Sequence, residues 1–100
     1  MPTSPAPPAL TTKQVAFLRS QAHRLEPLVR LGKQGATDGV RKEVETALAR
    51  HELVKVRTGR FVELDAAALA AALGAAVVQE LGHVLVLYRP AAEPRLSLPG

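Results

Sequence analysis

Two glycines three residues apart, Gly32 and Gly35, enclose a lysine and a glutamine at the end of a short apolar segment, residues 28–31. Glycine tolerates positive φ, and because it lacks a Cβ another chain can approach its backbone closely. A bulky side chain at either position would hold a sugar-phosphate backbone away, whereas the ammonium of Lys33 would meet a phosphate. The same spacing occurs in many ordinary turns, so by itself it leaves both interpretations open.

The residues after the glycine pair extend this possible contact. A second amphipathic stretch begins near Thr37, and the free N–H groups at the start of a helix attract anions. Arg41 and Lys42 lie on the early turns of that stretch. Taken singly, Lys33, Arg41 and Lys42 could equally be solvated surface charges.

Charge is unevenly distributed along the chain. Residues 11–60 hold eleven basic and five acidic side chains, a net charge of +6, whereas residues 61–100 hold two basic and four acidic ones, a net charge of −2. A localised positive surface concentrates polyanions and releases counterions from phosphates. From charge alone, a surface for nucleic acid and a soluble surface that is merely basic are equally favoured.

Length and composition bound the class of protein. One hundred residues, 47% of them hydrophobic, suffice for one domain with a buried core. No apolar run approaches the roughly 20 residues of a membrane helix. Residues 1–9 are proline-rich and lack the regions of a secretory signal, so we expect a disordered leader there. Cysteine is absent, which favours a cytoplasmic location.

Hydrophobic periodicity and capping residues predict alternating helices and strands. In chain order we expect a helix over 12–25, a strand over 28–31, a helix over 37–50, a strand over 53–57, a helix over 66–73, and strands over 76–81 and 84–88. The last two strands are apolar at nearly every position, which is typical of strands covered or paired on most sides. The order α-β-α-β-α-β-β predicts one compact α/β domain, a four-stranded mixed sheet with helices packed on it.

Several helix ends carry recognisable signals. Thr11 and Gln14 have the spacing of a capping box, and Pro27 is expected to end the first helix. Asp65 is a good N-cap for the third helix, and Gly74 is a natural residue to end it.

Catalysis is not indicated by any of the residues that could support it. His23, His51 and His83 do not have metal-ligand spacing with one another or with carboxylates, and the sequence motifs of nucleophilic hydrolases and nucleotide-binding loops are absent. Glu43 and Glu45 lie two residues apart on a helix and so point in different directions. We therefore expect a non-enzymatic protein without a metal or cofactor.

The aromatic residues are Phe17, Phe61 and Tyr88 only. They are too few for a sheet that stacks successive bases. If the chain holds nucleic acid, a backbone clamp at the glycine pair is the more coherent mechanism, as in the loops with which KH domains hold single strands.

Separated segments of the chain resemble one known family, in order and with similar spacing. They are Leu10–Gln14, Ala22–Val29, Gly32–Thr37, His51–Val56 and Leu85–Pro90. On these segments the chain resembles the CRM domain (chloroplast RNA splicing and ribosome maturation), and in particular its bacterial stand-alone form, the YhbY family. The resemblance covers residues 10–98, which we take as the domain.

The resemblance implies an RNA-binding domain with a KH-like GxxG loop, similar in fold to the C-terminal domain of a bacterial translation initiation factor. Bacterial single-domain members associate with precursors of the large ribosomal subunit and assist their assembly, while plant relatives assist group II intron splicing. We therefore expect ribosomal RNA as the partner of a monomeric protein that does not act at a membrane. A general KH-like RNA chaperone, or a module that binds an acidic protein, remain the alternatives.

The resemblance also implies roles for individual residues. The RNA-contacting loop is Gly32, Lys33, Gln34 and Gly35. Polar positions of the family motif add Lys13, His23 and Arg24. Lys55, in a matched segment, is either an RNA contact or a solvated lysine of the strand. Arg41 and Lys42 join these residues because of their place at the start of the second helix, not because of the resemblance. Tyr88 is expected to pack, and Arg89 to be a surface charge or a phosphate contact.

Two departures from the family pattern concern the far side of the domain. The stretch from Thr58 to Leu64 is shorter than expected, and the third helix is nearly all alanine and leucine. Leu69 and Leu73 are therefore expected to be packing residues. On the loop itself, we expect a change of Gly32 and Gly35 to Asp, combined with Lys33 to Ala, to abolish RNA binding and leave thermal stability nearly intact.

Overall fold

The computed structural model describes residues 9–32, 35, 37–59, 64–90, 96, 98 and 99. Its elements, in order, are α1 (Thr12–Ala22), β1 (Val29–Leu31), α2 (Asp38–His51), β2 (Leu53–Thr58), α3 (Ala66–Leu73), β3 (Ala76–Leu81) and β4 (Val84–Tyr88). The predicted order of helices and strands is confirmed. The leader up to residue 8, Lys33, Gln34, the centre of the shortened stretch at 60–63 and most of the tail after residue 90 lie outside the described residues.

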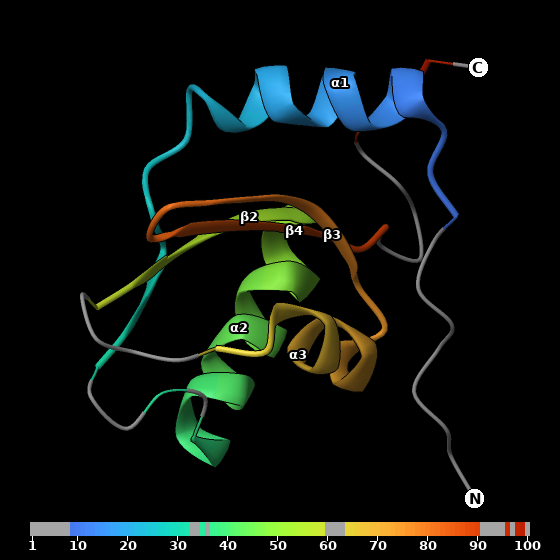
Figure 1. Cartoon of the computed structure of the whole chain (residues 1–100). Helices are drawn as coiled ribbons and strands as arrows, with labels where there is room; N and C mark the ends of the chain where they lie inside the picture. Colours follow the sequence, from blue (N-terminus) through green and yellow to red (C-terminus); the bar gives the residue numbers. More distant parts are fainter. Residues whose placement is uncertain are drawn as a thin grey trace, which may run out of the picture.

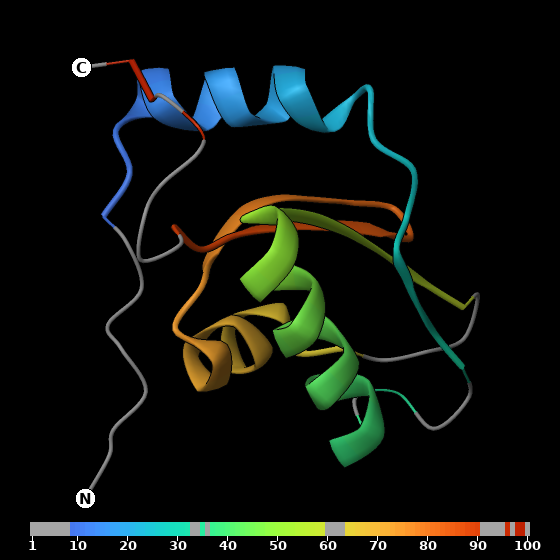
Figure 2. The same ribbon diagram turned by 180° about the vertical axis from the view of Figure 1, so that it is seen from behind.

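The elements form three layers (Figure 1). The sheet has the strand order β1-β2-β4-β3, with β1 parallel to β2 and the other neighbours antiparallel. Helix α1 covers one face, and α2 and α3 cover the other, as the view from behind also shows (Figure 2). The fold is the predicted mixed α/β sheet with helices on it.

Each face of the sheet has its own hydrophobic core. Between the sheet and the pair α2 and α3, the fully buried side chains include Val44, Leu48, Val56 and Leu87. On the α1 side, Leu18 and Ala22 pack against β2, β3 and β4. Alternate residues of each central strand therefore point into different cores.

The predicted caps are present. The hydroxyl of Thr11 accepts a hydrogen bond from the Gln14 N–H at 3.1 Å, and the Gln14 side chain accepts one from the Thr11 N–H at 3.0 Å. The Asp65 carboxylate accepts from the Ala68 N–H at 3.0 Å, and Gly74 ends α3 with φ of 65°. These local signals fix where α1 and α3 begin and where α3 ends.

The first helix is shorter than predicted. It ends at Ala22, and the Leu25 N–H donates to the Ala22 carbonyl in a turn before the extended approach to β1. Leu25 is consequently 38% exposed instead of lying on the buried face of a helix. Pro27 disfavours a helical conformation for the residue before it, so the chain leaves the helix early. Figure 2 shows this extended segment running down the side of the molecule from α1 to β1.

The prediction that both C-terminal strands are covered on most sides holds for β4 and is wrong for β3. Four of the five residues of β4 are buried, because it lies between β2 and β3. Strand β3 lies at the edge, and of its six residues only Val78 is buried. Val77 is 38% and Leu81 68% exposed. Within the described residues, none of the helices is both long and apolar enough to span a membrane.

Candidate nucleic-acid interface

The glycine pair closes a tight turn at the end of β1. The Gly32 carbonyl accepts a hydrogen bond from the Gly35 N–H at 3.0 Å, and the Gly35 carbonyl accepts one from the Thr37 N–H at 3.0 Å. The turn therefore leads directly from the edge strand into α2. The predicted contacts of Lys33 and Gln34 fall outside the described residues.

The structure requires glycine at position 35 but not at position 32. Gly35 is buried and has φ of 68°, a backbone conformation that other residues adopt only with strain. Gly32 is exposed, has no positive φ, and a Cβ placed on it would meet nothing within 4 Å. The expectation that both could become Asp without loss of stability is therefore wrong for Gly35. At Gly32, an added side chain would project only into the space in front of the turn.

The first turn of α2 carries both signs of charge. Its N-cap, Thr37, accepts a hydrogen bond from the Val40 N–H at 3.2 Å. Arg41, a predicted RNA contact, forms an ion pair with Asp38 on the same helix, and both side chains are largely exposed. The Asp38 carboxylate thus lies at the helix terminus where a phosphate was expected to bind.

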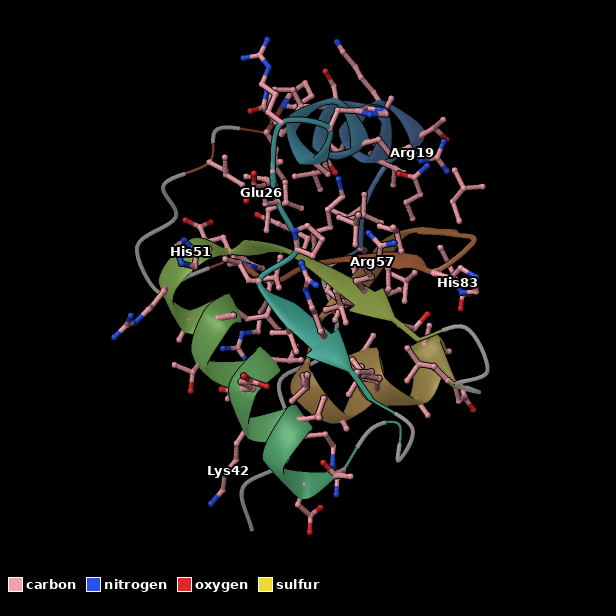
Figure 3. All side chains as sticks on the ribbon, turned by 90° about the vertical axis from the view of Figure 1, so that its left-hand side faces the viewer. Arg19, Glu26, Lys42, His51, Arg57 and His83 are labelled. Atoms are coloured by element: carbon pink, nitrogen blue, oxygen red, sulfur yellow. The ribbon has the colours of Figure 1, made fainter. Side chains whose placement is uncertain are left out.

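Lys42 has basic neighbours further along the helix. A hollow of about 340 Å³ beside β1 is lined by the basic residues Lys42, Arg50 and His51 and by the acidic Glu43, together with Leu28, Val29, Thr46 and Ala47. Figure 3 shows Lys42 near the start of α2 and His51 at its end. This hollow groups one predicted contact with two basic residues that were not predicted.

The predicted residues of α1 do not gather in one place. His23 and Arg24 are exposed just after the helix. Lys13 lies at the opposite end of α1, ten residues before His23, which corresponds to about 15 Å of helix. The structure therefore separates Lys13 from both His23 and the turn at Gly32.

The side chain of Lys55 forms hydrogen bonds at the end of α1. Its ammonium donates hydrogen bonds to the carbonyls of Ala22 at 3.1 Å and Leu25 at 3.2 Å. These carbonyls belong to the end of α1 and the turn after it, where a cation is favoured. The predicted RNA contact of Lys55 must therefore compete with this helix cap.

Two arginines that were not among the predicted contacts lie side by side on the sheet. Arg30 of β1 and Arg57 of β2 are partners in the parallel register, and both are exposed. The signal was present in the alternation of strands: Arg30 lies between two buried residues, and Arg57 follows Leu53 and Lys55 at every second position. Figure 3 shows Arg57 in the middle of this face, between α1 and α2.

Arg89, the residue after β4, joins the two helices that cover one face of the sheet. The Arg89 guanidinium donates to the Glu45 carboxylate at 2.5 Å and to the Leu73 carbonyl at 3.0 Å, which joins α2 to the end of α3. The Arg89 guanidinium is thus engaged within the protein. It is neither the free surface charge nor the available phosphate contact that the sequence predicted. Tyr88 packs as expected and is buried.

A buried carboxylate lies close to Tyr88. Glu52 joins α2 to β2 as a single residue with φ of 62°, and it is 1% exposed. Burial, and secondarily the charge of Glu52, raise the pKa of the Tyr88 hydroxyl above its ordinary value of 10.0. Among the described residues, histidines and carboxylates form no group of three that could hold a metal ion.

The fold and the turn define a class of protein: a small three-layer α/β domain with a GxxG turn between its first strand and second helix. The sequence profile of the family described as "CRS1 / YhbY (CRM) domain" matches residues 10–89. The chain belongs to this family.

Two bacterial proteins are similar to the chain over 90% of its length. An "RNA-binding protein" of Haemophilus influenzae is 46% identical over 94 residues, which cover 90% of this chain and 95% of that protein. The "Probable RNA-binding protein YqeI" of Bacillus subtilis is 39% identical over 95 residues, covering 90% of this chain and 99% of the relative.

A solved structure has the same fold. The solution structure of a hypothetical protein from Staphylococcus aureus superimposes with a TM-score of 0.72 at 32% sequence identity. The match covers 91% of this chain and the whole of the other.

Proposed function

We propose that the protein binds RNA through the Gly32–Gly35 turn and the basic residues around it, without catalysis, and that it assists assembly of the large ribosomal subunit. Membership of the CRM family and the RNA-binding names of its relatives support the first part. The ribosomal role rests on the family resemblance, and a cytoplasmic location is part of the same proposal.

The observation that carries the proposal is the exposed Gly32. Neither its backbone conformation nor its surroundings require a glycine. A reason for glycine arises when a second chain lies against the turn, because a side chain there would keep that chain at a distance. Basic residues on both sides of the turn favour a polyanion as that second chain.

Sucrose-gradient fractionation tests the ribosomal role. In lysates of cells that express a tagged chain, we expect the wild type to migrate with precursors of the large subunit, and Gly32→Asp to stay near the top of the gradient. Both should be equally abundant and equally stable to heat. RNA binding in vitro without migration in precursor fractions would favour a general RNA chaperone.

The remaining alternative is an acidic protein partner. Ribonuclease treatment of the lysate before fractionation separates the two, since it releases a protein held by RNA. A high-mass complex that survives ribonuclease would favour the protein partner.

A further inference from the structure

We propose that Arg30 and Arg57 together form a two-armed site for one RNA phosphate, on the open part of the sheet beyond the glycine turn. The inference rests on the proposed function and extends it: it gives the path that the RNA backbone takes after it leaves the turn. The residues of this site are not among those predicted from the sequence.

The register places both guanidinium groups on the same face. Val29, Arg30 and Leu31 of β1 pair in parallel with Val56, Arg57 and Thr58 of β2. Paired residues of neighbouring strands point the same way and lie about 4.8 Å apart. Two arginines at this spacing can direct their planar donor groups at one phosphate from two sides.

That face is the one that α1 covers only in part. Arg57 also pairs with Val84 of β4, whose side chain packs with the core beneath α1. Val84 in turn pairs with the 68% exposed Leu81. Arg30, Arg57, Val84 and Leu81 therefore form one row across all four strands, with two charges at one end and apolar side chains at the other.

Among the described residues, no ion pair is seen for Arg30 or Arg57. The ion pairs of Arg41 with Asp38 and of Arg89 with Glu45 lie outside this row. Like charges placed opposite each other on neighbouring strands destabilise a sheet. A bound phosphate would remove that repulsion, because one anion can accept hydrogen bonds from both groups.

The row lies between two groups of predicted contacts, which are the glycine turn and the residues at the end of α1. Arg30 precedes Gly32 by two residues, and the Gly59 N–H donates to the Leu31 carbonyl at 3.2 Å, so both strands end beside the turn. At the other side, a hollow of about 170 Å³ joins Val84 and Leu81 to Ala22 and His23 at the end of α1. The arginine pair thus bridges the turn and the end of α1.

Salt titrations of RNA affinity test this site. We compare the wild type with Arg30→Gln, Arg57→Gln and the double variant, with a single-stranded ribosomal RNA oligonucleotide as the probe. Arg19→Gln is the matched control, because Arg19 is exposed on α1 and its loss changes net charge equally. Figure 3 shows Arg19 on α1, away from Arg57.

The shared phosphate gives a distinctive result. Each single variant should lower the magnitude of the slope of log K against log salt by about 0.7, the value for one contact to a single strand. The double variant should add little to either single loss, and Arg19→Gln should retain the wild-type slope. Melting temperatures of the pair variants should stay level or rise by roughly 1 to 5 °C, because the repulsion is relieved.

Other results would overturn the site. If losses are additive and Arg19→Gln loses as much as the pair variants, the effect is that of net charge. If the pair variants bind with unchanged affinity and slope while Gly32→Asp does not bind, the site is wrong and the proposed function stands. A wild-type protein that does not bind RNA would overturn both.

Discussion

Asp38 places a negative charge at the start of α2, the helix end beside the proposed RNA contact. An acidic residue in the first turn stabilises the helix through the dipole, and Asp38 also forms the ion pair with Arg41. The same carboxylate repels a phosphate that approaches the turn. Helix stability and RNA affinity therefore make opposite demands on this one residue.

We predict that Asp38→Asn raises RNA affinity a few-fold and lowers the free energy of unfolding by about 0.5 kcal/mol. The substitution frees Arg41 and removes the repulsion, while it weakens the charge–dipole interaction. Binding titrations and urea unfolding of the same samples measure the two effects. Lower affinity in this variant would contradict the placement of RNA at the start of α2.

Tyr88 provides a pH-dependent signal of its own. Because burial and Glu52 raise its pKa in the folded protein, the folded state holds the hydroxyl proton more tightly than the unfolded state. The resulting stabilisation is fully present below about pH 10, the ordinary pKa of tyrosine, and is lost as pH rises through the folded pKa.

Tyr88 is the only tyrosine, and there is no tryptophan, so ultraviolet absorbance follows its ionisation directly. We predict a midpoint above that of the protein unfolded in urea. Glu52→Gln should lower the midpoint in part, because burial is the larger cause and persists. A midpoint equal to that of the unfolded protein would contradict the buried environment of Tyr88.

At the scale of the elements, Lys55 of β2 stabilises the end of α1. Its ammonium donates to the Ala22 carbonyl, which also accepts from the Leu25 N–H, and to the Leu25 carbonyl in the turn after the helix, where a cation is favoured. The residue is therefore needed for the position of α1 over the sheet, whatever it contributes to RNA.

We predict that Lys55→Met destabilises the protein by about 1 kcal/mol, or roughly 4 to 8 °C in melting temperature. RNA affinity should fall by less than in the Arg57→Gln variant, because the Lys55 ammonium is directed at the helix carbonyls. Calorimetry and binding titrations separate the two roles. A large loss of affinity with unchanged melting temperature would instead establish Lys55 as an RNA contact.

Local signals predicted most of the elements from the sequence. The capping box at Thr11, the N-cap at Asp65 and the left-handed Gly74 act within a few residues, so they are readable without a fold. The exposure of β3 depends on its place at the edge of the sheet. An apolar strand reads the same at an edge as in the centre, so its neighbours cannot be inferred from its composition.

For the candidate site, too, the sequence predicted the local motif and missed the contacts that depend on tertiary structure. The glycine turn is a local motif, and the structure confirms a turn there. The distance of Lys13 from it, the cap made by Lys55 and the ion pair of Arg89 arise from tertiary structure. The pairing of Arg30 with Arg57 required the register between two strands that are distant in the sequence.

At the scale of the whole molecule, one side carries the turn, the start of α2 and the open row of the sheet (Figure 3). The basic excess of residues 11–60 contributes Arg30, Lys42 and Arg57 to this side. Strand β1 lies at the sheet edge, and the exposed Gly32 follows it directly. The topology thus presents to a partner the part of the chain that is most positive.

The proposed function depends on a contact between RNA and Gly32, and titration of RNA with Gly32→Asp tests this contact. Thr12→Asp is the matched control, since it adds the same charge at an exposed first-turn position of α1, far from the turn. Gly32→Ala tests the steric effect without charge.

We predict melting temperatures within about 2 °C of the wild type for all three variants, because Gly32 has open space around it and first-turn aspartates are tolerated. Gly32→Asp should lose at least about tenfold in RNA affinity, or about 1.4 kcal/mol. Gly32→Ala should lose less, and Thr12→Asp should bind nearly as the wild type. Equal RNA affinity of a folded Gly32→Asp variant and the wild type would show that RNA does not lie against Gly32.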